Sequence, residues 1–174
     1  MDRFPEIETN RLLLGKLSFK DIPKIVEYAG NEKVAKTTLN IPHPYDEKDA
    51  IFWINSANKG LETKTQFTFG IRTKADDIFI GGIGLKLHTR LQRAELGYWI
   101  AEPFWNKGYA SEAVEGVLKF GFTEINLNKI FATHLVENPA SGKVMKKNGM
   151  VKEGDLFRGL VQYRMTKNEY ENKN

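Results

Sequence analysis

The segment WIAEPFWNKGYASEAV, which spans Trp99–Val114, carries the strongest structural signal in the sequence. It starts as an extended apolar stretch, passes through a loop that contains Pro103, and takes on a helical pattern after Gly108. The first turn of a helix leaves backbone N–H groups without intrahelical partners, and the helix dipole adds positive charge there. Because Gly108 also lets a ligand approach the backbone closely, the junction predicts a site for an anion such as a pyrophosphate.

The same junction does not match two common nucleotide-binding motifs. It lacks the Lys and Ser/Thr pair that ends a P-loop, and it lacks the three glycines of the dinucleotide fingerprint. A nucleoside triphosphate or NAD therefore fits less well than another pyrophosphate. The alternative interpretation is structural, since a single glycine before a helix is common and Gly108 then forms only a tight turn.

Strand and helix patterns alternate on both sides of this junction. Three strands separated by polar turns precede it as an antiparallel meander, and a 3.6-residue period follows it. The expected strands are residues 12–17, 67–72, 78–87, 93–101, 130–136, 151–157 and 160–166, and the expected helices start at or after Ser18, Asp46, Gly108 and Asn138. The polar end, residues 168–174, is expected to fray or to end the last element. This order predicts a single domain, residues 1–174, of the α+β or α/β class.

The first helix carries signals at both ends. Ser18 and Asp21 have the spacing of a capping box, with Asp21 in place of the usual Glu or Gln. Apolar residues then recur at helical spacing until Gly30 and Asn31, which are expected to stop the helix.

The composition is typical of a globular protein, and no apolar run approaches the roughly 20 residues that cross a bilayer. The start, MDRFPEIETNR, carries charges where a signal peptide is apolar, so we expect a cytoplasmic protein. The net charge of +4 is spread along the chain without a recognisable nucleic-acid module. We therefore expect neither a nucleic-acid nor a membrane partner, and a homodimer is the simplest assembly.

The chain has no cysteine, which excludes disulfides, thiolate zinc sites and a covalent acyl-cysteine intermediate. Its three histidines, His43, His88 and His134, lack the spaced partners of a metal site, so we expect no metal. Any acyl transfer would then proceed directly between two bound substrates.

The loop PFWNKGYASEA resembles the acetyl-CoA loop of the GNAT acetyltransferase superfamily, whose motif is Gln or Arg, two residues, Gly, one residue, then Gly or Ala. Trp105, Gly108 and Ala110 occupy these positions. Trp105 departs from the general motif, but a tryptophan at this position is familiar in the branch that resembles the Rim-type ribosomal-protein N-acetyltransferases. Asn106 stands where a glycine is usual in that branch. The resemblance implies that main-chain groups of this loop bind the pyrophosphate of CoA. The implied residues are Trp105, Asn106, Lys107, Gly108, Tyr109, Ala110 and Ser111.

Two further segments resemble the same family. HLVENPASGKVMKKNGMVKEG is similar to its element of Asn, two residues, Ser and a helix, with Asn138 and Ser141 in those positions. The resemblance implies that Asn138 binds the pantetheine arm and that Ser141 approaches the sulfur. The local alternative is that Asn138 only caps a helix ahead of Pro139.

RAELGYWIA, residues 93–101, resembles the central strand of the family, which runs beside the acetyl group. Strand alternation places Glu95 and Trp99 on one face and Tyr98 and Ile100 on the other. The resemblance adds Trp99, Ile100 and Ala101 to the implied cofactor site. It also implies an α+β (α/β three-layer) GNAT fold with a mostly antiparallel, twisted central sheet of about seven strands. About four helices flank this sheet, which is splayed between the fourth and fifth strands.

Acetyl transfer requires that a protonated amine lose a proton before it attacks the thioester of acetyl-CoA. Glu95 is the candidate base, although an exposed strand carboxylate or a salt bridge explains it equally well. A backbone N–H near Ile100 would stabilise the oxyanion. The resemblance implies that Ser141 protonates the departing thiolate, with Tyr109 as the alternative.

Resemblance to the Rim-type branch implies that the acceptor is a protein N-terminus, such as that of a ribosomal protein. A polyamine or an aminoglycoside-like amine is the alternative, and it would need a more acidic cleft than Asp46, Glu47 and Asp49 clearly supply. A non-catalytic acyl-CoA-binding sensor is the second alternative.

Overall fold

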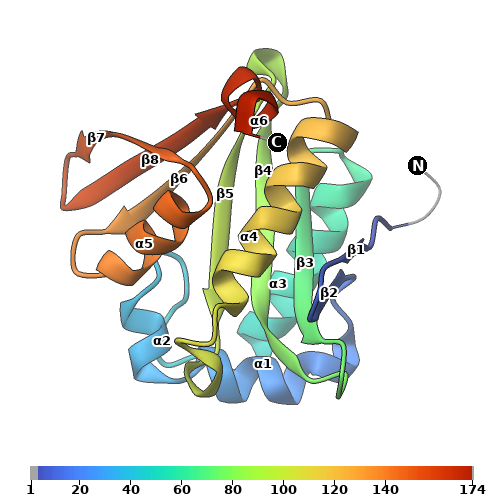
Figure 1. The fold of residues 1–174 in the computed structure, drawn as a ribbon. Coiled ribbons are helices and arrows are strands. Elements are labelled where there is room, and N and C mark those ends of the chain that lie inside the picture. Colours follow the sequence, from blue (N-terminus) through green and yellow to red (C-terminus); the bar gives the residue numbers. More distant parts are fainter. Residues whose placement is uncertain (1–3, 174) are drawn as a thin grey trace.

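A computed structural model describes residues 4–173 and shows one eight-stranded sheet (Figure 1). The strand order is β1-β2-β3-β4-β5-β6-β8-β7, and all neighbours are antiparallel except the parallel pair β5 and β6. The strands are β1 (Ile7–Glu8), β2 (Leu12–Gly15), β3 (Gln66–Thr73), β4 (Phe79–His88), β5 (Arg93–Ile100), β6 (Lys129–Leu135), β7 (Val151–Leu156) and β8 (Leu160–Thr166).

Helices cover both faces of the sheet, which makes three layers (Figure 1). The helices are α1 (Ile22–Ala29), α2 (Glu32–Lys36), α3 (Glu47–Glu62), α4 (Tyr109–Lys119), α5 (Pro139–Lys147) and α6 (Lys167–Lys173). α4 and α5 pack together on one face, and α1 and α3 pack together on the other.

Each face of the sheet has its own apolar core. The larger core lies under α4 and α5 and includes the buried side chains of Phe69 and Val117. The smaller core lies under α1 and α3 and includes Ile25 and Ile54. Burial of these two faces is the main force that stabilises the layered arrangement.

The sheet splits between β5 and β6. Only Arg93–Leu96 of β5 pairs with β6, at Lys129–Ala132. β5 nevertheless continues to Ile100 and β6 to Leu135. The two strands therefore diverge towards their carboxyl ends (Figure 1). A split was predicted between the fourth and fifth strands. β5 and β6 are those two strands, because the short β1 was not among the strands expected from the sequence.

The predicted fold class is confirmed, but the structure has more elements than the expected seven strands and four helices. β1 is a two-residue strand, too short to leave a periodic pattern. Asn31 was expected only to stop α1, but its side chain accepts the Lys33 N–H at 2.9 Å and also begins α2. The capping box between Ser18 and Asp21 is confirmed.

The polar tail was expected to fray or to end the last element; fraying is wrong for residues 168–173, which form most of the last element, α6, whereas Asn174 lies outside the described residues. Thr166 and Glu169 form reciprocal bonds in which each side chain accepts the other's backbone N–H, as in a capping box. The ring of Tyr170 stacks on Phe122 at 4.9 Å, so tertiary contact also holds this helix.

None of the helices within residues 4–173 is long and apolar enough to cross a bilayer. The same residues contain no group of three or more His, Asp or Glu side chains arranged to hold a metal ion.

Candidate active site

The loop between β5 and α4 has the backbone form expected of an anion site. Asn106 and Gly108 both have left-handed backbones, with φ values of 59° and 80°. Gly108 is the N-cap of α4, and it supplies no side chain to satisfy the N–H groups of the first helical turn. Asn106, Lys107 and Gly108 are exposed, so the main chain that leads into this helix N-terminus is accessible to an anionic ligand.

Trp105 fixes the loop to the end of β5. Its indole N–H donates a hydrogen bond to the carbonyl oxygen of Ile100 at 2.6 Å, and its ring packs against the larger core. At the other end of the loop, Ser111 is buried, and its hydroxyl and carbonyl oxygens accept hydrogen bonds from the Asn148 amide. The side chains of Trp105 and Ser111 therefore support the loop, while its main chain is left for a ligand.

The split in the sheet leaves part of the β5 backbone facing a gap. Ala101 donates its N–H to the carbonyl oxygen of Ile80 on β4 at 2.8 Å. Because bonding direction alternates along a strand, Tyr98 and Ile100 direct their N–H groups to the opposite side, where β6 has separated. The Ile100 N–H predicted to stabilise an oxyanion therefore faces this gap.

Trp99 and Ala101 face away from the gap. The Trp99 side chain packs against Trp53 and Phe79, with ring centroids 5.9 and 6.0 Å apart, and Ala101 is buried in the same core. The structure therefore does not bring their side chains to the cofactor loop, and their place in a cofactor site stays a prediction.

Ser141 lies in the first turn of α5, and its hydroxyl meets that of Tyr98 at 2.7 Å. Burial raises the pKa of Tyr98 to about 12, although the hydrogen bond with Ser141 acts in the opposite direction. Tyr98 thus keeps its proton at neutral pH and can donate it to the Ser141 oxygen. Sequence reasoning missed this pair, because alternation placed Tyr98 on one face of the strand without showing what its hydroxyl contacts.

Asn138 caps α5, as the local alternative predicted. Its side-chain oxygen accepts the Ser141 N–H at 3.4 Å, and its amide nitrogen donates to the carbonyl oxygen of Thr37 at 3.0 Å. Thr37 ends α2, so Asn138 joins α2 to the helix that carries Ser141. The role of Asn138 towards pantetheine stays a prediction.

Glu95 is half-buried on the face of β5 opposite Tyr98. In register it lies between Lys86 on β4 and Phe131 on β6, and within residues 4–173 its carboxylate makes no hydrogen bond or ion pair. Glu95 and Ser141 therefore flank the strand from its two sides instead of touching one another.

Tyr109, the alternative proton donor, lies elsewhere. Its ring lies 4.5 Å from the guanidinium of Arg11 and 6.4 Å from the ring of Phe104. Tyr98 is the tyrosine that contacts Ser141. The geometry therefore favours Tyr98 over Tyr109 as the partner of the serine.

The sequence model of the acetyltransferase (GNAT) domain matches residues 11–151. YnaD, an uncharacterized N-acetyltransferase of Bacillus subtilis (strain 168), is 39% identical over 150 residues, which cover 85% of this chain and 84% of that protein. Mycobacterium smegmatis RimJ in complex with CoA-disulfide has a TM-score of 0.85 at 20% identity, covering 95% of this chain and 89% of that chain. Spermidine N-acetyltransferase from Vibrio cholerae, in complex with CoA and spermine, has a TM-score of 0.79 at 23% identity, covering 92% of this chain and 98% of that chain.

The split sheet and the helix N-terminus without a side-chain cap beside it, together with the match to the acetyltransferase domain, identify a transferase that uses an acyl-CoA. More narrowly, the chain belongs to the GNAT acetyltransferase family and is an acetyl-CoA-dependent N-acetyltransferase. The family and the enzyme class expected from the three sequence motifs are thus confirmed. The Rim-type branch and the amine acceptor stay predictions.

Proposed function

We propose that the acceptor is the N-terminal α-amine of a protein, such as a ribosomal protein, and that acetyl passes to it directly in a ternary complex. The observation that carries this proposal is the carboxylate of Glu95, which has no hydrogen bond or ion pair within residues 4–173 and lies two residues before an open position in the strand. That position is Gly97, where an added side chain would meet no atom within 4 Å. A peptide α-amine carries a single positive charge, so one carboxylate beside free space suits it.

A polyamine carries several positive charges and would call for several free carboxylates. Of the three acidic residues considered for that role, Asp46 and Asp49 form a capping box at the start of α3 and Asp46 also pairs with Lys48, whereas Glu47 is exposed and makes no hydrogen bond or ion pair within residues 4–173. Glu102, beside the loop, is held by Lys33 and Asn31. These pairings favour a singly charged acceptor, although spermidine N-acetyltransferase from Vibrio cholerae shares the fold.

In the proposed chemistry, residues on the two faces of β5 have different roles. Acetyl-CoA supplies a thioester whose carbonyl carbon is attacked by the amine. The residues that would hold it are the main chain of Asn106–Ser111 at the pyrophosphate and Asn138 at the pantetheine arm. Glu95 takes a proton from the ammonium group, directly or through water, before the free amine attacks, and the nitrogen releases its second proton to solvent as the amide forms. The Ile100 N–H stabilises the oxyanion.

The departing sulfur needs a proton when the C–S bond breaks. Ser141 gives its hydroxyl proton to the thiolate, Tyr98 can replace it through the 2.7 Å hydrogen bond between the two hydroxyls, and a proton from solvent water restores the phenol. Because burial holds the pKa of Tyr98 at about 12, that proton is present throughout the neutral range. The amine proton and the sulfur proton are thus handled on opposite faces of the strand.

Thiol release from acetyl-CoA, followed with a colorimetric reagent, tests the acceptor. The protein contains no cysteine and is therefore silent in this assay. Peptides that begin with Ser, Ala or Met should be turned over, whereas spermidine, spermine and aminoglycosides should not. Preferred turnover of a polyamine or drug would overturn the proposal, and so would acetyl-CoA binding without turnover of any amine, which would indicate a sensor.

Glu95→Gln should lower kcat/KM for the peptide by roughly 10²-fold or more while leaving the Kd for acetyl-CoA unchanged. The loss should shrink at high pH, where the amine deprotonates without help. Glu62→Gln, an exposed carboxylate at the end of α3, is the matched control and should behave as the wild type. Equal activity of the two variants would remove Glu95 from the mechanism.

A further inference from the structure

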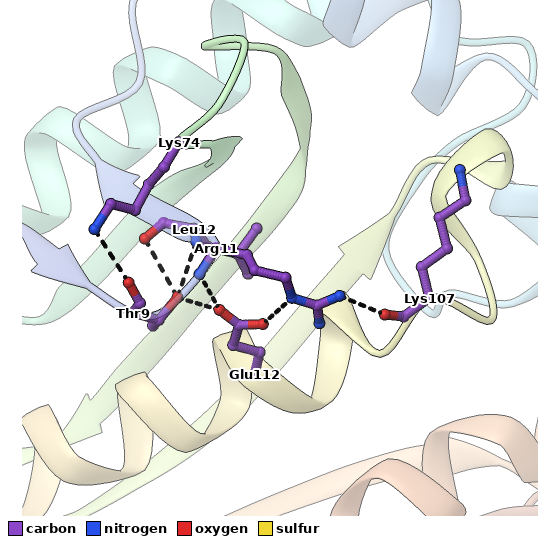
Figure 2. Close-up of polar contacts among 6 residues, drawn as sticks. All are labelled: Thr9, Arg11, Leu12, Lys74, Lys107 and Glu112. Carbon is purple, nitrogen blue, oxygen red and sulfur yellow. Dashed lines mark hydrogen bonds and ion pairs between the residues drawn. The ribbon is translucent and has the colours of Figure 1, made fainter.

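The turn between β1 and β2 contacts the start of α4, although about a hundred residues separate them in sequence (Figure 2). The carboxylate of Glu112, in the first turn of α4, accepts three hydrogen bonds from this turn. The donors are the hydroxyl of Thr9 at 2.6 Å, the backbone N–H of Arg11 at 2.6 Å and the Nε of Arg11 at 2.7 Å. Glu112 is therefore fixed from three directions.

The other side of the Arg11 guanidinium contacts the cofactor loop. Its Nη1 donates to the carbonyl oxygen of Lys107 at 3.0 Å (Figure 2), and the group lies 4.5 Å from the centre of the Tyr109 ring. Its Nη2 lies 3.4 Å from where a Cβ on Gly108 would be. Arg11 thus contacts Lys107 and Tyr109 and lies beside Gly108 between them, in the loop on whose main chain the anion site depends.

The ion pair between Arg11 and Glu112 also sets the charge at the start of α4. An unpaired carboxylate in the first turn of α4 would repel a pyrophosphate bound at the same helix end. Burial alone would raise the pKa of Glu112, but the hydrogen bonds from Thr9 and Arg11 outweigh it and lower that pKa, so the group is ionised at neutral pH. Arg11 neutralises this charge, and with 43% of its side chain exposed, against 15% for Glu112, it leaves cationic surface at the loop.

We propose that Arg11 is a positioning residue for acetyl-CoA. It holds Lys107–Tyr109 in the conformation that presents their N–H groups to the pyrophosphate, and it cancels the negative charge of Glu112. This inference rests on the proposed role of the loop but not on the identity of the amine acceptor.

Calorimetric titration of the free protein with CoA, together with kinetics using S-acetylpantetheine, tests this role. Arg11→Gln should weaken CoA binding by roughly tenfold, because both the loop contact and the neutralising charge are lost. It should leave kcat/KM for S-acetylpantetheine, which has no pyrophosphate, within about twofold of the wild type. Arg11→Lys should be intermediate, since a lysine supplies charge but cannot bond to Glu112 and Lys107 at once.

Lys74→Ala is the matched control. Lys74 donates to the carbonyl oxygen of Thr9 in the same turn (Figure 2) and bonds to Glu8 at the end of β1, but it does not bond to the cofactor loop. Amide hydrogen exchange of residues 105–110 should accelerate in Arg11→Gln and not in Lys74→Ala. Unchanged CoA binding by Arg11→Gln, or an equal loss with CoA and S-acetylpantetheine, would overturn the inference, whereas failure of the wild type to bind CoA would overturn the cofactor site itself.

Discussion

Two hydroxyl groups on separate elements meet at the centre of the proposed site. Tyr98 comes from β5 and Ser141 from the first turn of α5, where Asn138 holds the Ser141 N–H. A serine hydroxyl is a weak acid, so it donates a proton to a thiolate more readily when a second donor replaces that proton. The buried phenol supplies this donor because it stays protonated well above neutral pH.

Ser141→Ala should lower kcat by roughly 10²-fold while leaving the Kd for acetyl-CoA nearly unchanged, because the hydroxyl acts only on the departing sulfur. Stopped-flow thiol release and calorimetry measure the two quantities separately. An equal loss of affinity and turnover would contradict the role of proton donor.

Tyr98→Phe should lower kcat by less than Ser141→Ala does, roughly tenfold, because Ser141 keeps its own proton. The double variant with Ser141→Ala should be little slower than Ser141→Ala alone, since the phenol acts through the serine. Fully additive losses in kcat would show that the two hydroxyls act independently.

Among the elements, α6 depends on side chains at its first turn. The carboxylate of Glu169 accepts hydrogen bonds from the N–H and hydroxyl of Thr166 at 2.8 and 2.9 Å and also pairs with Arg164. The bond from Arg164 and those from Thr166 lower the pKa of Glu169 to about 2. The sequence TKNE carries this signal of a helix start, which the polar character of the tail obscured.

Glu169→Gln should destabilise the protein at pH 7 by about 1 kcal/mol, the usual scale of a helix cap. A carboxyl whose pKa is lower in the folded state stabilises fully above its ordinary value of 4.5, and this contribution is lost as the pH falls towards 2. The difference in Tm between wild type and variant should therefore be largest above pH 5 and shrink below pH 4. Glu171→Gln, which loses only an exposed pair with Lys167, should show no such trend.

For the whole molecule, two glycines paired across β4 and β5 differ in the space beside them. Gly84, on β4 between β3 and β5, has no room, because a Cβ there would lie 2.6 Å from the carbonyl oxygen of Phe67. Gly97, directly opposite Gly84 on β5, lies beyond the last residue pair with β6 and would meet nothing within 4 Å.

Gly97→Ala should leave the free energy of unfolding unchanged or raise it by up to about 1 kcal/mol, because alanine restricts the unfolded chain. It should raise KM for the amine acceptor but not for acetyl-CoA, since its Cβ points to the Glu95 face of β5. Gly84→Ala, by contrast, should destabilise the protein by about 1–3 kcal/mol. Urea unfolding and steady-state kinetics measure these effects, and an unchanged acceptor KM for Gly97→Ala would place the amine elsewhere.

The sequence by itself determined the features that depend on neighbouring residues. The helix expected to start at or after Asn138 is α5, and the meander, the capping box at Ser18 and the glycine before α4 all occur as expected. Hydrophobic period, capping and turn chemistry act over a few residues, so they can be read locally.

Only the tertiary structure decided which distant groups meet. It places Tyr98 against Ser141, 43 residues away, and Arg11 against Glu112, 101 residues away. It also gives Trp105 its bond to Ile100 and turns Trp99 away from the loop. Such contacts depend on how α4 and α5 pack on the sheet and on where its strands part, and no local pattern encodes that three-dimensional arrangement.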